Sequence, residues 1–122
     1  MCIYKLMEMI SAPSIQSVTD ELIELIDSRF FKALSEPVRV QLLKHLIVGG
    51  KSDIASIAEA FPQDRSVISR HLQAMQSAGI LRTEKISRHV FYEIDGPHVL
   101  EKFEGIAAKI RQCLPHCCPA GE

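Results

Sequence analysis

Hydrophobic residues recur every three to four positions through most of the chain, a pattern typical of amphipathic helices. It predicts a first firm helix over about Thr19–Leu34, a second through Val38–Ile47 and a short third over Asp53–Ala60. Ser35 and Ser52 stand directly before the second and third helices, where a hydroxyl can cap the first turn. The first half of the chain is therefore expected to be helical.

The most informative stretch is Asp64–Gly79, which we expect to be a helix capped by its first and last residues. Ile68, Leu72 and Met75 follow the i, i+4, i+7 spacing of one apolar face. The opposite face carries no carboxylate and consists of Arg65, Ser66, Ser69, Arg70, Gln73 and Gln76. Arginine can pair with guanine, and glutamine and serine can bind bases or phosphates. The pattern fits a DNA major groove, but also a solvated amphipathic helix, so the neighbouring elements must decide.

After this helix the hydrophobic period changes to two, which predicts strands over Leu81–Lys85 and Val90–Ile94. Ile86–His89 lies between them, so the pair reads as a hairpin with a basic tip. A last helix follows, with two apolar stripes that give more apolar surface than one small core requires. We expect it to stop near Cys113, because Pro115 cannot donate a helical hydrogen bond.

Composition and charge restrict the class of protein. The chain has 122 residues, enough for one domain, and its 47% hydrophobic and 24% charged residues are typical of a soluble globular protein. The net charge of −1 gives no overall attraction to nucleic acid. Between Asp64 and His89, however, basic residues outnumber acidic ones, so any attraction is local.

Targeting and redox features point to the cytoplasm. The N-terminus lacks the cationic region of a signal peptide, and no apolar run is long enough to cross a membrane. Cytoplasmic thiols are normally reduced, so the four cysteines are read as metal ligands or redox sensors rather than as disulfides.

The order of these elements is that of a mainly α winged helix-turn-helix with a β-hairpin wing. The segments FKALSEPVRVQLLKHL, DIASIAEAF, SVISRHLQAMQSAGIL and HVFYEI resemble the ArsR/SmtB family of metal-responsive repressors over about Phe30–Ile94. The resemblance implies a homodimer, with the first and last helices at the interface, that represses a promoter on double-stranded operator DNA until an inducer binds. We expect an N-terminal arm over 1–17, a DNA-binding and dimerisation domain over 18–114 and a cysteine-containing tail over 115–122.

Matching positions in the family imply DNA contacts on the polar-faced helix, and the basic tip of the hairpin, as the wing, is expected to add others. The expected contacts are Arg65, Ser66, Ser69, Arg70 and His71 on the helix and Lys85, Arg88 and His89 on the hairpin. The basic hairpin residues suit phosphates or an adjacent minor groove. His71 flanks the apolar side of its helix, so a packing contact is the alternative for that residue.

The inducer sites known in this family are not matched here. A Cys-x-Cys pair at the short third helix would fall on Asp53 and Ala55, which supply no thiolate. A zinc site on the last helix would need four ligands at Gly96, His98, Lys109 and Gln112, of which one is a histidine. A dithiol redox sensor would need a cysteine within Val38–Ile47, which has none.

A cluster of thiols near the C-terminus remains, formed by Cys113, Cys117 and Cys118. An all-thiolate site suits a soft ion, with As(III) or Sb(III) favoured and Cd, Pb or Hg possible. Zinc prefers four ligands, and His116 or Cys2 would have to supply the fourth. The alternative is a flexible tail with spare thiols.

Other functions remain open at this point. The same thiols would also serve a repressor that senses oxidation by forming a disulfide. An interaction module with a structural zinc clip is a further alternative. A cysteine-dependent enzyme is disfavoured, because no Arg-rich or Gly-rich anion cradle surrounds the thiols. We expect the protein not to be an enzyme.

Overall fold

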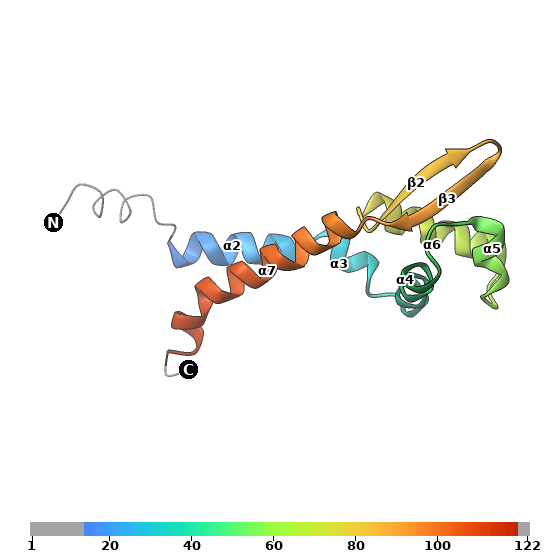
Figure 1. Cartoon of the computed structure of the whole chain (residues 1–122). Coiled ribbons are helices and arrows are strands. Elements are labelled where there is room, and N and C mark those ends of the chain that lie inside the picture. Colours follow the sequence, from blue (N-terminus) through green and yellow to red (C-terminus); the bar gives the residue numbers. More distant parts are fainter. Residues whose placement is uncertain (1–13, 120–122) are drawn as a thin grey trace. The chain divides into compact units, whose positions relative to one another are not determined.

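The computed structural model describes residues 14–119, which fall into two compact units. Residues 27–102 form one unit, and the residues before 27 together with those after 102 form the other. The elements in chain order (Figure 1) are α2 (Ile15–Ile26), α3 (Arg29–Ala33), α4 (Pro37–Gly49), β1 (Ser52–Asp53), α5 (Ile54–Glu59), α6 (Arg65–Ser77), β2 (Leu81–Ile86), β3 (His89–Ile94) and α7 (Gly96–Cys117). The mainly helical fold with a β-hairpin that the sequence predicts is confirmed.

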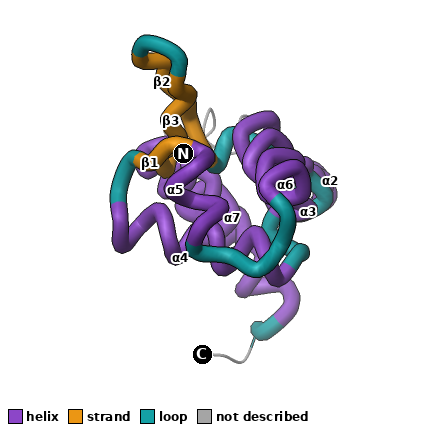
Figure 2. The backbone as a smooth tube through the Cα atoms, turned by 90° about the vertical axis from the view of Figure 1, so that its right-hand side faces the viewer, coloured by secondary structure: helices purple, strands orange, loops and turns teal. Residues whose placement is uncertain are grey.

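The sheet is antiparallel, with strand order β1-β3-β2. Tyr92 lies at its centre, opposite Thr83 on β2 and Ser52 on β1. β2 and β3 continue beyond the helices as a projecting hairpin (Figure 2). Its turn is shorter than expected, because Ile86 and His89 pair with each other and leave only two residues between them.

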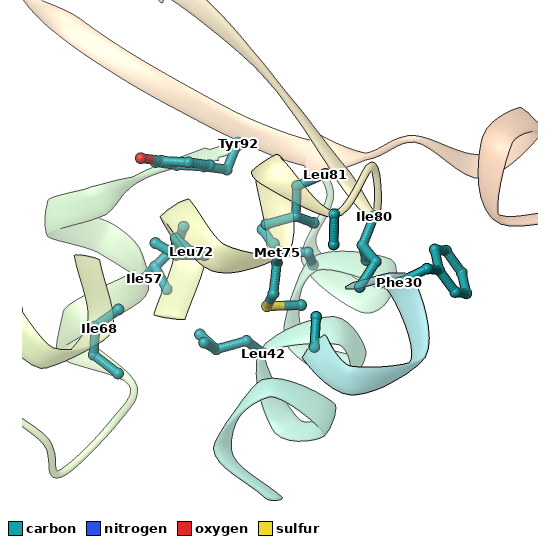
Figure 3. Packing of buried hydrophobic residues seen from close by; sticks show 12 residues of the cluster. Phe30, Leu42, Ile57, Ile68, Leu72, Met75, Ile80, Leu81 and Tyr92 are labelled. Atoms are coloured by element: carbon teal, nitrogen blue, oxygen red, sulfur yellow. The ribbon is translucent and has the colours of Figure 1, made fainter. Parts of the chain in front are cut away.

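The core of the 27–102 unit surrounds α6, which packs against α3, α4, α5 and β2. Ile68, Leu72 and Met75 are completely buried, as their spacing predicts. Figure 3 shows them among side chains from each neighbouring element; the buried cluster is Phe30, Ala33, Leu42, Leu46, Ile57, Ile68, Leu72, Met75, Ala78, Ile80, Leu81 and Tyr92. This packing turns the opposite, polar face of α6 to the outside.

The C-terminus of α6 confirms the predicted role of Gly79, which has a φ of +85°. Its N–H donates to the carbonyl of Gln76 (3.0 Å), and the N–H of Ile80 donates to that of Met75 (2.9 Å). These two bonds form a Schellman motif, which requires a left-handed residue and therefore favours glycine. At the other end Asp64 is the N-cap residue as predicted, although its carboxylate makes no capping bond.

The expected single helix over Thr19–Leu34 is wrong, because the chain breaks at Asp27 and Ser28. Ser28 has an extended backbone, with φ −91° and ψ 162°, and its carbonyl accepts from the N–H of Lys32 (3.1 Å). Asp and Ser favour helix caps over helix interiors, since their side chains compete for backbone hydrogen bonds. The apolar period runs through the break, which is why it was missed.

Two predicted hydroxyl caps are also wrong. Glu36 is the N-cap of α4, while the Ser35 hydroxyl donates to the carbonyl of Lys32 (2.7 Å) at the end of α3. Asp53 caps α5 by accepting from the N–H of Ser56 (3.0 Å), whereas Ser52 pairs in the sheet. β1 has no counterpart among the predicted strands, because its two residues are too few for a periodic signal.

The expected end of the last helix near Cys113 is wrong as well, since α7 includes Pro115 and continues to Cys117. A proline so close to the end removes one hydrogen bond, and the next turn still closes from the N–H of Cys118 to the carbonyl of Leu114 (2.8 Å). Residues 1–13 of the expected N-terminal arm lie outside the described residues.

In the second unit, α2 and the later part of α7 are joined by an ion pair between Glu21 and Lys109 (3.1 Å). Val18 on α2 is buried. Among the residues that the structure describes, no helix is both long and apolar enough to span a membrane.

Candidate nucleic-acid interface

The exposed face of α6 carries the side chains that the sequence predicts to meet DNA. Arg65, Ser66 and Arg70 are exposed, and Ser69 is half-buried. The Ser69 hydroxyl accepts from the Nε2 of Gln73 at 3.5 Å, one turn further along the helix. This face therefore presents guanidinium, hydroxyl and amide groups on a helix fixed from behind by its buried side.

Charge on this face and the hairpin is more one-sided than the sequence suggests. The acids of the hairpin are already paired: Glu93 accepts from Arg82 (2.9 Å), and Glu84 pairs with Lys51. Within α6 and the β2–β3 hairpin, four cations have no carboxylate within 4 Å among the described residues, namely Arg65, Arg70, Lys85 and Arg88. These four are the residues best placed to attract phosphate.

His71 makes a polar contact inside the protein that the sequence analysis did not foresee. Its Nδ1 accepts from the Nε of Arg39 on α4 (3.0 Å), and the Nη1 of Arg39 also donates to the carbonyl of Ala33 (3.4 Å). A histidine that accepts at Nδ1 is neutral and carries its proton on Nε2. His71 thus joins α4 to α6 and keeps one N–H to donate; Arg39 lies 32 residues away, with no local signal to pair the two.

His89 begins β3 and contacts the N-cap of α5, with its Nδ1 3.3 Å from the carboxylate of Asp53. Hydrogen bonds from Ser56 hold the pKa of Asp53 below its ordinary value, and the charges of His89 and Arg65 add to this effect. His89 is therefore exposed like Lys85 and Arg88 on the same hairpin, but unlike them it contacts a carboxylate.

Lys51 is a further residue that the sequence analysis missed. Its ammonium pairs with Glu84 on β2 and lies 3.9 Å from Glu93 on β3. The hydrogen bond to Glu84 raises the pKa of Lys51 above its ordinary value. These contacts fix the base of the hairpin to the segment that leads into α5.

The three predicted thiol ligands lie at the end of α7. Cys113 is half-buried, and Cys117 and Cys118 are exposed free thiols. A hydrogen bond with the Cys118 thiol, together with burial, raises the pKa of Cys117 above its ordinary value. Cys113 lies one helical turn earlier, and no group of three potential ligands is assembled among the described residues. Cys2 lies outside those residues.

The chain matches known proteins over this region. Residues 36–83 match the family model described as bacterial regulatory protein, arsR family. An uncharacterized HTH-type transcriptional regulator of Methanocaldococcus jannaschii is 31% identical over 61% of this chain and 83% of that protein. A cadmium resistance transcriptional regulatory protein CadC homolog of Staphylococcus aureus is 29% identical over 63% of this chain; the match spans 64% of that relative's own length.

A solved structure has the same fold. It is the homodimeric winged helix-turn-helix DNA-binding domain of a possible ArsR-family transcriptional regulator from Mycobacterium bovis. It aligns with a TM-score of 0.58 and 27% identity, over 80% of this chain and 88% of that one. The winged helix-turn-helix architecture predicted from the sequence is confirmed.

Proposed function

The chain belongs to the arsR family of bacterial regulatory proteins, and we propose that it is a repressor released from operator DNA by a thiophilic metal or metalloid ion. The observation that carries the DNA-binding part is the exposed face of α6, where Arg65 and Arg70 have no carboxylate within 4 Å among the described residues. The helix is packed from behind by its completely buried residues, so the backbone that carries its outer side chains is held in place.

The proposed contacts divide into two kinds. Arg65, Ser66, Ser69, Arg70 and His71 lie on α6, which we propose enters the major groove, where arginine can read guanine. On the hairpin, the cations Lys85 and Arg88 and the ring of His89 are proposed to meet phosphates or the adjacent minor groove. The wing therefore adds affinity, and the helix adds sequence preference.

We further propose that the protein acts as a homodimer. α7 has no buried residue, and Leu100, Ile110 and Leu114 lie along one side of it with exposed fractions of 44–58%. Such a stripe on a helix is stabilised by a partner that removes it from water. The relative of known structure is described as a homodimer, which supports a second copy as that partner.

We propose Cys113, Cys117 and Cys118 as ligands of the inducing ion. Their chemistry fits a soft ion, with As(III) or Sb(III) favoured and Cd, Pb, Hg or Zn as further candidates. The relative named for cadmium resistance supports a metal-linked role. For the divalent ions Cd, Pb, Hg and Zn, binding to thiolates should release protons, so affinity should rise with pH. As(III) and Sb(III) arrive as neutral hydroxides whose hydroxide groups leave as water with the thiol protons, so their binding should release no net protons.

The proposed switch runs through α7. Drawing Cys117 and Cys118 toward Cys113 would rearrange the last turn of this helix and with it the proposed dimer contact. A dimer must place two α6 helices in successive half-sites, so its affinity is sensitive to their relative angle. Coupling energies between sites are typically about 1–3 kcal/mol, enough to release a promoter held near its dissociation constant.

The inducer is tested by fluorescence anisotropy on the upstream DNA, with As(III), Sb(III), Cd, Pb, Hg and Zn as titrants. The wild type should lose DNA affinity with at least one of these ions. The triple variant Cys113→Ser/Cys117→Ser/Cys118→Ser should bind DNA as before and no longer respond, whereas Cys2→Ser should respond like the wild type. A triple variant that still leaves DNA on addition of the ion would place the sensor elsewhere.

The recognition residues are tested by single substitutions at matched salt. Arg65→Ala or Arg70→Ala should weaken specific binding by roughly 1–3 kcal/mol where the guanidinium reads a base. Lys85→Ala and Arg88→Ala should weaken binding to all sequences and flatten its salt dependence. Arg111→Ala, an exposed residue of α7, is the matched control. Unchanged binding in both α6 variants would refute the assignment of this helix.

A redox sensor is the alternative use of the same thiols, since Cys117 and Cys118 are adjacent in the chain and exposed. Cys113 and Cys117 are four residues apart on a helix, with Cβ atoms about 5–6 Å apart. A disulfide needs about 3.5–4.5 Å, so this reaction would also require the helix end to rearrange. Release of DNA by peroxide without metal would identify this alternative.

A further inference from the structure

A second candidate binding site lies on the 27–102 unit, in a cavity of about 330 Å³ between α3, α4 and α6. Arg29 and Lys32 line it from α3, Arg39 from α4 and Ser77 from the end of α6. Ala33 and Ala74 complete the lining. Two arginines, one lysine and one serine are therefore among the residues that line the cavity, and no acidic residue lines it.

These cations are available to an anion. Arg29 has no carboxylate within 4 Å among the described residues, and Lys32 pairs only with Asp27 (3.2 Å). Both partners of that pair are about 70% exposed, and an ion pair so exposed contributes little to stability. An anion in the cavity can therefore take over Lys32 at small cost.

Arg39 contacts both the cavity and the proposed recognition helix. Its Nε donates to Nδ1 of His71 (3.0 Å) and its Nη1 to the carbonyl of Ala33 (3.4 Å). A guanidinium has five N–H donors, and only two of them are used here. The remaining donors match the paired oxygens of a phosphate or carboxylate.

We propose that this cavity binds a small oxyanion, a free metabolite that carries a phosphate or carboxylate group, and that Arg39 transmits its binding to α6. A volume of about 330 Å³ lies at the small end of the range for ligand pockets, which suits a small anionic group. The second part of the proposal rests on the proposed binding of DNA by α6. An anion that draws the Arg39 guanidinium toward the cavity weakens the bond to Nδ1 and lets the His71 ring turn away from its position on the DNA face.

Binding is tested without DNA, by titrating the full-length protein with inorganic phosphate against chloride at matched ionic strength. Amide and arginine side-chain NMR signals should shift in a saturable way at Arg29, Arg39 and Ser77. The variant Arg29→Gln/Lys32→Gln should bind phosphate at least tenfold more weakly. The control Arg111→Gln/Lys44→Gln, which removes the same charges at exposed positions outside the cavity, should bind like the wild type. Absence of saturation, or equal loss in the control, would overturn the proposal.

Coupling is tested by DNA anisotropy with and without saturating phosphate. We expect at least a fivefold loss of affinity beyond the chloride effect in the wild type, and none in Arg29→Gln/Lys32→Gln. Arg39→Lys keeps the positive charge but lacks the guanidinium and its paired N–H donors. This variant should bind phosphate, but phosphate should no longer lower its affinity for DNA. Phosphate binding with unchanged DNA affinity in the wild type would refute the coupling.

Two further outcomes distinguish a free anion in the cavity from a DNA phosphate, and this site from the proposed function. If Arg29→Gln/Lys32→Gln loses DNA affinity in the absence of phosphate while the control does not, the cavity holds a DNA phosphate, and the free ligand is refuted. The response to As(III) or Cd involves other residues, so it should persist in this variant. If α6 does not bind DNA, the NMR titration can still show phosphate binding, but the anisotropy experiment cannot show coupling. The two experiments together therefore distinguish failure of the proposed function from failure of this site.

Discussion

Gly79 ends α6 and leads into β2, and its replacement by alanine tests how the proposed recognition helix is held. The backbone there has a φ of +85°, which costs a residue with a side chain about 1–2 kcal/mol. Part of this cost is offset, since alanine also restricts the unfolded chain by about 0.4–1 kcal/mol. The conformational term alone therefore predicts a small loss of stability.

A second term comes from His98. A Cβ added at Gly79 would lie 2.6 Å from both Cδ2 and Nε2 of that ring, closer than real contacts allow. The ring lies edge-on to Phe30 with centroids 6.4 Å apart, so turning it out of the way would give up this contact. The backbone N–H of His98 is also held by the carboxylate of Asp95 (3.3 Å). Gly79→Ala should therefore lower the free energy of unfolding by about 1–3 kcal/mol in total, within the range of strained single substitutions.

The assay is urea unfolding followed by circular dichroism at fixed protein concentration, on a double-mutant cycle with His98→Ala. Truncating His98 removes the collision and leaves the strained φ, so Gly79→Ala should cost less in that background than in the wild type. Equal costs in both backgrounds would show that the ring does not obstruct the site. A cost near zero in the wild type would refute the whole argument, including the Schellman geometry.

Two further predictions concern the core and pH. Leu72→Ala should lower the free energy of unfolding in urea by about 2–5 kcal/mol, because this side chain is completely buried. The control Gln73→Ala, on the exposed face, should change it by no more than about 0.5 kcal/mol. Similar losses for both variants would refute the assigned faces of α6. The pKa of the Asp53 carboxyl is lowered in the folded state, so above the unfolded pKa of about 3.9 this group stabilises the protein. The contribution is lost as the pH falls through the pKa of the folded state. Asp53→Asn keeps a capping residue and should flatten the fall in stability below about pH 4; an unchanged acid limb in thermal unfolding would contradict the role of Asp53.

Much of the fold could be predicted where one face of an element is buried and the other exposed. Along α6, the period of Ile68, Leu72 and Met75 gives both the helix and its orientation, and Gly79 marks its end. The break at Ser28 has no such signal, because the apolar period of α2 runs on into α3. A proline near a helix end is similarly ambiguous: the end of α7 depends on whether one lost hydrogen bond outweighs the turn that follows it.

The candidate DNA face was predictable for the same reason, since a polar face follows directly once the buried face is known. The contacts that its side chains make with other parts of the protein could not be predicted. The bond between Arg39 and His71 joins residues 32 positions apart, and the pairs of Lys51 with Glu84 and of His89 with Asp53 arise only when the sheet brings them together. Residue types alone give the charge of this surface, whereas three-dimensional pairing decides which cations remain available.

At the end of α7, the stability of the last helical turn determines how easily the three thiols can come together. Cys113 and Cys117 lie on one face of a helix, and Cys118 follows the last helical residue, so a three-thiolate site requires this end to change shape. Pro115 has already removed the hydrogen bond that its N–H would have donated to the carbonyl of Arg111. The last turn is closed instead by the bond from Cys118 to Leu114, so unwinding it breaks few backbone bonds. Under the proposed function, an ion that binds three thiolates therefore needs to overcome little helix stability, and its effect begins at the end of the helix that we propose forms the dimer contact.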